Sequence, residues 1–305
     1  MSYPSRRAIL QRIGAGSLAA ALTPRSTRAA DAPKTEKSAS TTPRFKLGLI
    51  TYMVGAKWDL PTLLKVCKSV GIASLELRTG HAHGVEPTLG ADQRKDVRKQ
   101  IEDSGVVLWG LGSTCEFHSP DKKVVDKNIE QCKQFLQLAA DVGATGVKIR
   151  PNALPKGVPP EQTIEQIGKA LNVCGETAQS LGREVWAEVH GNGTQMPPVM
   201  KSIMEHCGHK SVGVTWNSNG EDVDAGSIAK SFETLRPWIR SCHINDLWKD
   251  STGAYPYREL FRRFNETGYD RYTMCEAPYQ PADVAAGETF LRYYKALWTE
   301  LARRA

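Results

Sequence analysis

Two glutamates lie in strand-like segments that are otherwise apolar, where a carboxylate is costly unless it is paired or metal-bound. Glu188 stands in the run Val-Trp-Ala-Glu-Val and Glu276 in Thr-Met-Cys-Glu-Ala, while Asn217 and His243 hold similar positions in two further runs. Their oxygens and nitrogen form a mostly hard ligand set that favours Mn²⁺, with Mg²⁺ or Co²⁺ as alternatives. The pattern predicts one divalent metal ion bound by Glu188, Asn217, His243 and Glu276. Any one of them alone is more typical of a buried hydrogen bond.

Further polar residues follow the predicted strands and are candidates for binding or converting a substrate. The candidate catalytic groups are Glu188 and Glu276, whose strands are separated by two others around a barrel so that they could flank opposite faces of a substrate, and His190, which shares a strand face with Glu188. The candidate substrate-binding residues are His81, His83, Glu116, His118, Lys148, Arg150, Trp216 and Lys249. We expect the three cations among them at the mouth of the site, with a surface ion pair as the alternative for each. The two early histidines fit a substrate pocket or a solvated loop better than a second metal site, and the tryptophan either stacks on a substrate or packs in the core.

Eight apolar, β-rich segments alternate with helical patterns and must position these residues. The segments are Phe45–Met53, Ala73–Thr79, Val106–Thr114, Gly146–Arg150, Glu184–Val189, Ser211–Trp216, Ser241–Asp246 and Tyr272–Glu276. Between them, apolar residues recur at steps of three and four, as on one face of a helix. The spacing of about 32 residues matches one βα unit. The sequence therefore predicts a single α/β domain at 45–305, a (β/α)8 barrel whose site lies at the carboxyl ends of its strands. An open doubly wound sheet is the alternative, but no Gly-rich phosphate loop follows the first segment.

The first 32 residues differ from the rest in composition. Arg6 and Arg7 precede a mildly apolar stretch and then small residues at Ala29, Ala30 and Ala32, as in a twin-arginine export signal. We predict export to the periplasm by the twin-arginine machinery, with a polar linker at 33–44; a disordered basic tail is the alternative. The chain has no run of 18 apolar residues, so no stable membrane span is expected.

Charge and cysteine usage narrow the class of protein further. The net charge is +7, but residues 1–32 hold five arginines against one aspartate, so the remainder is nearly balanced and no nucleic-acid partner is expected. The seven cysteines are scattered and form no Cys-x-x-Cys pair. We expect buried free thiols rather than disulfides or a zinc–thiolate site. A homo-oligomer is compatible with this composition.

Five short segments resemble the sugar phosphate isomerase/epimerase family, also called the xylose isomerase-like TIM-barrel family. They are Gly-Val-Lys-Ile-Arg-Pro-Asn (146–152), Ala-Glu-Val-His-Gly (187–191), Val-Thr-Trp-Asn-Ser-Asn (214–219), Cys-His-Ile-Asn-Asp-Leu (242–247) and Met-Cys-Glu-Ala-Pro (274–278). The resemblance covers about 45–303 and implies one divalent metal on Glu188, Asn217, His243 and Glu276. The family usually has Asp where this chain has Asn217, His where it has Gly220, and often Arg where it has Lys249.

The resemblance implies a divalent-metal-dependent isomerase or epimerase that removes the proton α to a carbonyl and passes through an enediolate. Because export suits glycoside breakdown better than phosphosugar metabolism, we expect an unphosphorylated sugar or keto-sugar, or a glycoside, as the small-molecule partner. A lyase that eliminates the aglycone from 3-keto-glycosides is the alternative, and a non-catalytic sugar-binding barrel is a further one. A related nuclease for abasic DNA is disfavoured, because its three-metal, histidine-rich cluster is missing here.

Overall fold

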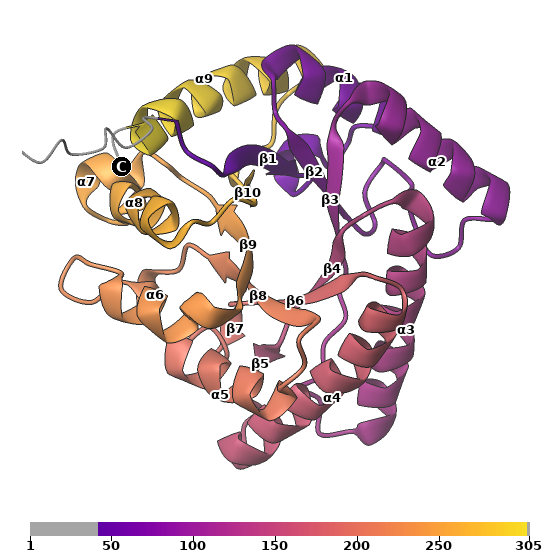
Figure 1. Cartoon of the computed structure of the whole chain (residues 1–305), viewed down its shortest axis with the longest axis vertical. Helices are drawn as coiled ribbons and strands as arrows, with labels where there is room; N and C mark the ends of the chain where they lie inside the picture. The colour runs from indigo at the N-terminus through magenta and orange to yellow at the C-terminus, as the bar shows by residue number, and fades with distance from the viewer. Residues whose placement is uncertain (1–41, 304–305) are drawn as a thin grey trace, which may run out of the picture. The chain divides into compact units, whose positions relative to one another are not determined.

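Eight parallel strands close into a barrel in the computed structural model, which describes residues 42–303 (Figure 1). The strands are β1 (Lys46–Ile50), β2 (Ser74–Arg78), β3 (Val107–Gly112), β4 (Gly146–Ile149), β6 (Glu184–Glu188), β8 (Val212–Asn217), β9 (Ile239–Ile244) and β10 (Tyr272–Cys275). Their order around the barrel is β1-β10-β9-β8-β6-β4-β3-β2. The predicted (β/α)8 barrel is therefore confirmed. The predicted export signal and most of the predicted linker lie outside the described residues.

The strands arise where they were expected, with shifts of up to three residues at their ends. β1 ends at Ile50, three residues before the predicted end, β8 extends one residue further, to Asn217, and β9 begins two residues earlier, at Ile239. A two-stranded sheet that was not predicted pairs β5 (Asn152–Ala153) with β7 (Gly191–Asn192). It ties the loop after β4 to the loop after β6, and Gly191 is required there because a Cβ atom would collide with the backbone of Asn152. These two loops carry Arg150 and His190, so the small sheet fixes part of the site.

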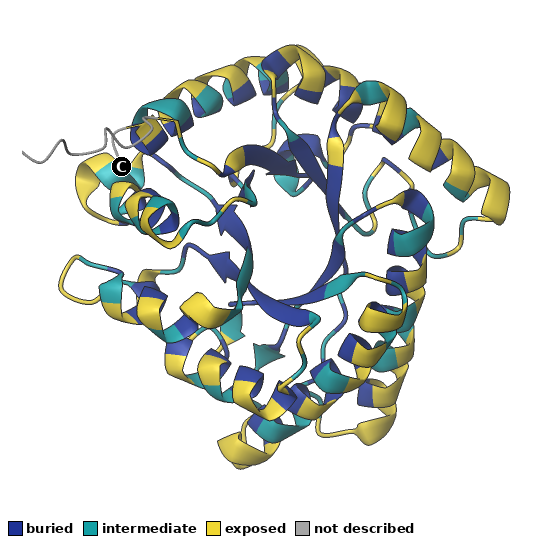
Figure 2. Cartoon of the chain, viewed as in Figure 1, coloured by how far each residue is buried: buried dark blue, intermediate teal, exposed yellow. Residues whose placement is uncertain are grey.

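Helices surround the barrel, with buried faces toward the strands and exposed faces outward (Figure 2). They are α1 (Leu60–Val70), α2 (Ala91–Ser104), α3 (Lys122–Val142), α4 (Pro160–Ser180), α5 (Pro197–Cys207), α6 (Ala229–Leu235), α7 (Lys249–Thr252), α8 (Tyr257–Thr267) and α9 (Val284–Arg303). Asp59 caps α1 by accepting the Thr62 N–H at 3.0 Å, and Gly71 ends it in the left-handed conformation. Among the described residues, no helix is long and apolar enough to cross a membrane.

Aromatic side chains fill the barrel interior below the strand ends. The rings of Trp109 and Trp186 stack with centroids 4.9 Å apart, and Met274 packs with them. The Trp109 indole N–H donates to Ser241 Oγ at 3.1 Å, which satisfies the one polar atom of this ring. The interior is a packed core at this level, so polar groups have room only above it, toward the carboxyl ends of the strands.

All seven cysteines are buried and free, as predicted. Cys67, Cys132, Cys174 and Cys207 lie on the buried faces of α1, α3, α4 and α5. Burial raises the pKa of the Cys207 thiol to about 11, which keeps it protonated and weakly reactive at neutral pH. Their role in the described fold is packing.

Candidate metal centre

A cavity of about 370 Å³ opens at the carboxyl ends of the barrel strands. It is polar, and it brings together seven of the residues that the sequence indicated for the site. Its lining is Tyr52, Arg78, Lys148, Arg150, Glu188, His190, Asn217, Asn245, Asp246, Lys249, Glu276 and Pro278. Tyr52, Arg78, Asn245, Asp246 and Pro278 were not predicted as site residues, although each closely follows or ends a predicted strand.

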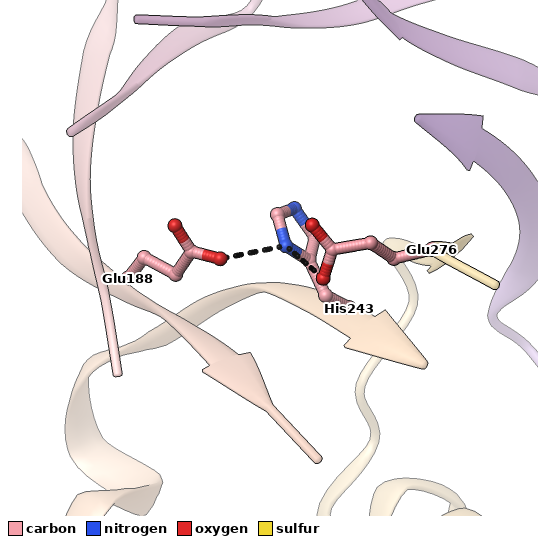
Figure 3. A group of neighbouring side chains, drawn as sticks. All are labelled: Glu188, His243 and Glu276. Carbon is pink, nitrogen blue, oxygen red and sulfur yellow. Dashed lines mark ion pairs between the residues drawn. The ribbon is translucent and has the colours of Figure 1, made fainter. Parts of the chain in front are cut away.

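Three of the predicted metal ligands converge at one point, where Glu188 and Glu276 line the cavity and His243, which is not among the lining residues, lies buried beside them. Glu188 ends β6, His243 lies on β9 and Glu276 directly follows β10, and one ligand atom from each lies within 4.8 Å of the others. His243 Nδ1 is 3.3 Å from Glu188 Oε1 and 3.4 Å from Glu276 Oε2 (Figure 3). Despite these distances, Nδ1 makes no hydrogen bond of acceptable geometry. The three groups therefore point at a common position rather than at one another.

Asn217 faces the same cavity from β8, in register with His243. Its side chain is buried, and its Oδ1 atom has no hydrogen-bond partner in the described part of the chain. An unpartnered buried oxygen is costly and calls for a ligand. Two carboxylates, an imidazole nitrogen and a free amide oxygen fit a divalent cation such as Mn²⁺, Mg²⁺ or Co²⁺.

The electrostatics of His243 also call for a cation at this position. Burial alone would lower the pKa of His243, but Glu76, Glu276 and Glu188 together outweigh burial and raise the pKa well above its ordinary value. Three carboxylates thus surround one ring. A positive charge there is stabilising, and either an imidazolium or a bound metal ion supplies it.

Glu76 is a part of this site that the sequence analysis did not assign. It is fully buried on β2, and its Oε2 atom lies 3.2 Å from His243 Nε2. Gly112 on β3 leaves room for it, because a Cβ atom there would lie 3.1 Å from Glu76 Oε1. Because Nε2 is bonded to Glu76, the ring presents Nδ1 to Glu188 and Glu276. Carboxylates that bond to metal-bound histidines commonly orient the ring in this way. The signal was in the sequence, since Glu76 stands between Leu75 and Leu77 just as Glu188 stands in an apolar run.

Lys148 lies inside the site and not at its mouth, which corrects the expectation from the sequence. Its side chain is 3% exposed, and its Nζ atom lies 2.8 Å from Glu188 Oε2. Burial alone would raise the pKa of Glu188, but the Lys148 ammonium and His243 outweigh it and hold the pKa well below its ordinary value. Glu188 is therefore ionised at neutral pH, with one oxygen toward Lys148 and the other toward His243.

Arg150 and Lys249 line the cavity with acidic partners of their own. Arg150 donates to Glu116 Oε1 at 2.7 Å, and Lys249 lies 3.3 Å from Asp246. Glu116 also accepts a bond from Asn152 at 2.7 Å, so it acts as a support behind Arg150. Neither Glu116 nor His118, whose Nδ1 is 3.9 Å from Glu116, is among the residues that line the cavity.

Three other predicted substrate-binding residues are engaged outside the cavity lining. His83 uses both ring nitrogens on backbone groups, the Arg78 carbonyl at 2.8 Å and the Val85 N–H at 3.0 Å. His81 Nδ1 bonds Thr51 Oγ1 at 3.0 Å. Trp216 is fully buried on the outer face of β8, where its indole N–H donates to the Tyr255 hydroxyl at 2.9 Å. Trp216 is therefore a core residue, which is one of the two alternatives that the sequence left open.

His190 is another polar group of the lining with an open position. It follows β6 on the same face as Glu188, and its Nδ1 atom is buried without a hydrogen-bond partner among the described residues. The Thr194 hydroxyl donates to the His190 backbone carbonyl at 2.6 Å and so fixes the turn that carries it. The ring can exchange a proton or a hydrogen bond with a molecule in the cavity.

Comparisons with known proteins agree with this architecture. A family model described as xylose isomerase-like TIM barrel matches residues 64–294. Among solved structures, a D-psicose 3-epimerase in the presence of D-fructose is similar at 15% identity and a TM-score of 0.71, over 85% of this chain and 99% of that one. A 3-keto-D-glucoside 4-epimerase from E. coli is similar at 15% identity and a TM-score of 0.67, over 84% and 99%. The IolI protein with a bound zinc atom is similar at 15% identity and a TM-score of 0.69, over 85% and 98%.

These identities are low, so the solved structures establish the fold and not the reaction. A search of curated protein sequences found no match. The family match and the barrel together confirm the xylose isomerase-like fold that the five sequence segments implied.

Proposed function

The chain belongs to the xylose isomerase-like TIM barrel family, and from this membership we propose that it is a divalent-metal-dependent isomerase or epimerase of an unphosphorylated sugar or keto-sugar. The observation that carries the proposal is the convergence of buried His243 with Glu188 and Glu276, which line a polar cavity, beside the unpartnered oxygen of Asn217. Structures with this fold include epimerases of D-psicose, of 3-keto-D-glucoside and of L-ribulose.

A bound divalent ion, held by Glu188, Asn217, His243 and Glu276, would polarise a substrate carbonyl and stabilise negative charge on its oxygen. Mn²⁺ is the ion that we propose for this oxygen-rich set, with Mg²⁺ and Co²⁺ as alternatives. Asn217 carries no charge, so the ligand set is less negative than one with aspartate at this position. Less of the charge of the ion is then neutralised by the protein.

The two glutamates differ in ways that assign them different roles. Glu188 is 3% exposed and bonded to Lys148, which lowers its basicity. Glu276 is 16% exposed and has no ammonium partner in the described chain. We therefore assign Glu276 the removal of the proton α to the carbonyl. The return of a proton to the opposite face is assigned to the Lys148–Glu188 pair, with the Lys148 ammonium as the source of the proton; exchange with solvent then restores Glu276 and Lys148.

A lyase acting on 3-keto-glycosides is the second candidate, and His190 is the observation that favours it. In that reaction a glutamate removes the C2 proton, the electron pair forms a C1–C2 double bond, and the C1–O bond to the aglycone breaks. The departing oxygen needs a proton, and the unpartnered Nδ1 of His190 in the cavity lining can supply it. The same base and the same carbonyl activation serve both reactions, and the fate of the β substituent separates them.

Deuterium exchange at the carbon next to the carbonyl tests the proposal, whether the product is an isomer, an epimer or the product of elimination. The Mn²⁺-loaded protein is incubated in D₂O with a panel of neutral and acidic ketoses and 3-keto-glucosides, and NMR follows loss of the α proton and release of aglycone. We expect exchange on at least one panel member, abolished in Glu276→Gln and retained in the control Glu102→Gln on the exposed surface of α2. Absence of both exchange and elimination across the panel would leave a sugar-binding barrel as the remaining function.

We also propose that the chain is exported to the periplasm by the twin-arginine route. The support is the arginine pair Arg6-Arg7 ahead of the mildly apolar stretch. Replacing both with lysine should retain the protein in the cytoplasmic fraction of a bacterial host. Equal periplasmic amounts of the parent and the Arg6→Lys/Arg7→Lys variant would contradict this route.

A further inference from the structure

One cationic side chain of the cavity has no acidic partner. Lys148, Arg150 and Lys249 each form an ion pair. Arg78, which also lines the cavity, forms no ion pair and no side-chain hydrogen bond with any described residue. An arginine kept at a cavity wall without a counter-charge is ready to bind an anion.

Arg78 is nevertheless held firmly in place. Its guanidinium lies over the ring of Tyr52, with the central carbon 5.6 Å from the ring centroid. Its backbone N–H donates to Thr51 Oγ1 at 2.9 Å, and its carbonyl accepts from His83 Nε2 at 2.8 Å. Tyr52 lines the cavity as well. The end of β2 therefore presents a planar cation stacked on an aromatic ring, with its backbone fixed on both sides.

Nearby titratable groups do not neutralise Arg78. Glu86, the acid of the following loop, binds the Thr79 hydroxyl at 2.7 Å and the Gly80 N–H at 2.6 Å. Burial lowers the pKa of His81 to about 4, with Arg78 and His83 adding to the effect, so His81 is neutral at pH 7. The positive charge at this wall therefore belongs to the guanidinium alone.

The other charges around the metal centre offset one another. Three carboxylates, Glu76, Glu188 and Glu276, surround His243, and a divalent ion bound there together with the Lys148 ammonium would balance them. Asn217 adds no charge. A neutral sugar would therefore leave Arg78 uncompensated, whereas an anionic one would not.

We propose that Arg78, stacked on Tyr52, is a carboxylate-binding subsite, and that the substrate is therefore an acidic sugar such as a keto-uronate or a keto-aldonate. The inference rests on the proposed function for the chemistry at the metal centre. The guanidinium fork matches the two oxygens of a carboxylate. A phosphate dianion is less suited, since Arg78 is the one unpaired cation among the described lining residues.

Binding of sugars without a carbonyl tests the subsite independently of turnover. Isothermal titration compares D-gluconate, D-galactonate and D-mannonate with D-glucitol, D-galactitol and D-mannitol, pairs that differ only in carboxylate against hydroxymethyl. We expect at least one aldonate to bind roughly tenfold tighter than its alditol, as a charge-assisted hydrogen bond provides. Arg78→Gln should abolish this preference, Arg78→Lys should retain part of it, and Arg98→Gln on the exposed face of α2 should leave it unchanged.

Three results would overturn the subsite. One is equal affinity of all three aldonates and their alditols, or no binding of either. Another is a preference that persists in Arg78→Gln, which would place the carboxylate on the metal or on Lys148. The third is tighter binding of D-glucitol 6-phosphate than of every aldonate. The first two leave the proposed reaction untouched, and the third would contradict only its unphosphorylated substrate. The reaction itself fails if the deuterium-exchange assay gives no exchange and no elimination on keto-sugars.

Discussion

The two halves of the cavity wall carry opposite kinds of side chain. The half built by β6, β8, β9 and β10, which are consecutive around the barrel, supplies Glu188, Asn217, His243 and Glu276 (Figure 1). The half built by β1 to β4 supplies Tyr52, Arg78, Lys148 and Arg150 to the same cavity. One half thus offers ligand atoms for a cation, with Lys249 paired to Asp246 beside them, and the other offers three cations and an aromatic ring. Under the proposed function, the first half would carry the chemistry and the second would select the substrate.

Two buried contacts join the halves and make them interdependent. Lys148 on β4 bonds Glu188 on β6, and Glu76 on β2 bonds His243 on β9. In each contact a residue of the selecting half sets the charge or the orientation of a ligand in the other half. Variants of the metal-site residues and of these two contacts should separate the contributions of the two halves. Their expected effects decrease from Glu276→Gln to Asn217→Asp.

Loss of the proposed base should have the largest effect. Glu276→Gln keeps the size and an oxygen ligand but removes the carboxylate that accepts the proton. We expect the rate of α-proton exchange to fall about 10³-fold or more, within the range for a general base. NMR in D₂O measures the rate, with metal content determined in parallel. A decrease smaller than tenfold with full metal loading would move the role of base to another residue.

Lys148→Met should destabilise the protein without removing a ligand. It leaves the Glu188 carboxylate buried without its ammonium, and breaking such a pair costs about 3–5 kcal/mol. Urea unfolding of EDTA-treated protein at pH 7 measures the loss, and the double variant Lys148→Met/Glu188→Gln should recover most of it. Equal stability of parent and single variant would show that the pair contributes nothing.

The same ion pair predicts a dependence on pH. The pKa of Glu188 is lower in the folded protein than in the unfolded chain, so its contribution is fully present above the unfolded value of about 4.3 and declines as the pH falls below it. The stability difference between the parent and Lys148→Met should therefore shrink as the pH falls from 5 toward 3. A difference that grows with acidification would contradict an ionised Glu188.

Glu76→Gln should weaken metal binding by about tenfold or more, as loss of a carboxylate behind a metal-bound histidine commonly does. The amide is similar in size, so the barrel should remain folded. Competition with a chelating dye gives the Kd, and Glu86→Gln on the loop after β2 is the matched control. An unchanged Kd for Glu76→Gln would mean that the His243 ring is oriented without help from β2.

Asn217→Asp should have the smallest effect, and it should tighten metal binding where Glu76→Gln weakens it. The added charge should tighten metal binding several-fold, because affinity rises with the number of charged ligands. The more neutralised ion should then polarise a carbonyl less, and turnover should fall. The dye competition measures the affinity. Weaker binding by Asn217→Asp would show that this position faces away from the metal.

Alternation along the strands explains what the sequence could predict. Continuous apolar, β-rich runs predicted the eight strands, and polar residues within those runs marked Glu188, His243 and Glu276. The same alternation places Trp216 on the opposite face from Asn217, and it puts Glu76 and Arg78 on one face of β2. Alternation alone would therefore have assigned Trp216 to the core and Glu76 and Arg78 to the site.

The sequence did not predict how deep a side chain lies in the barrel or how the loops fold. Alternation gives the face of a residue but not its layer in the barrel, so Lys148, two residues before Arg150, was expected at the mouth although it reaches inward to Glu188. Loop residues have no periodicity at all. His83 and Glu116 therefore could not be distinguished in advance from cavity-lining residues, and the structure shows that they support Arg78 and Arg150 instead.

Metal content tests the proposed metal centre most directly. Elemental mass spectrometry is applied to the purified chain and to its His243→Ala variant, with Arg98→Gln as a surface control. We expect close to one equivalent of Mn, Co or Mg in the parent and the control, and much less in His243→Ala. No metal in the parent after reloading, or equal metal in His243→Ala, would contradict a metal centre at the ends of β6, β8, β9 and β10.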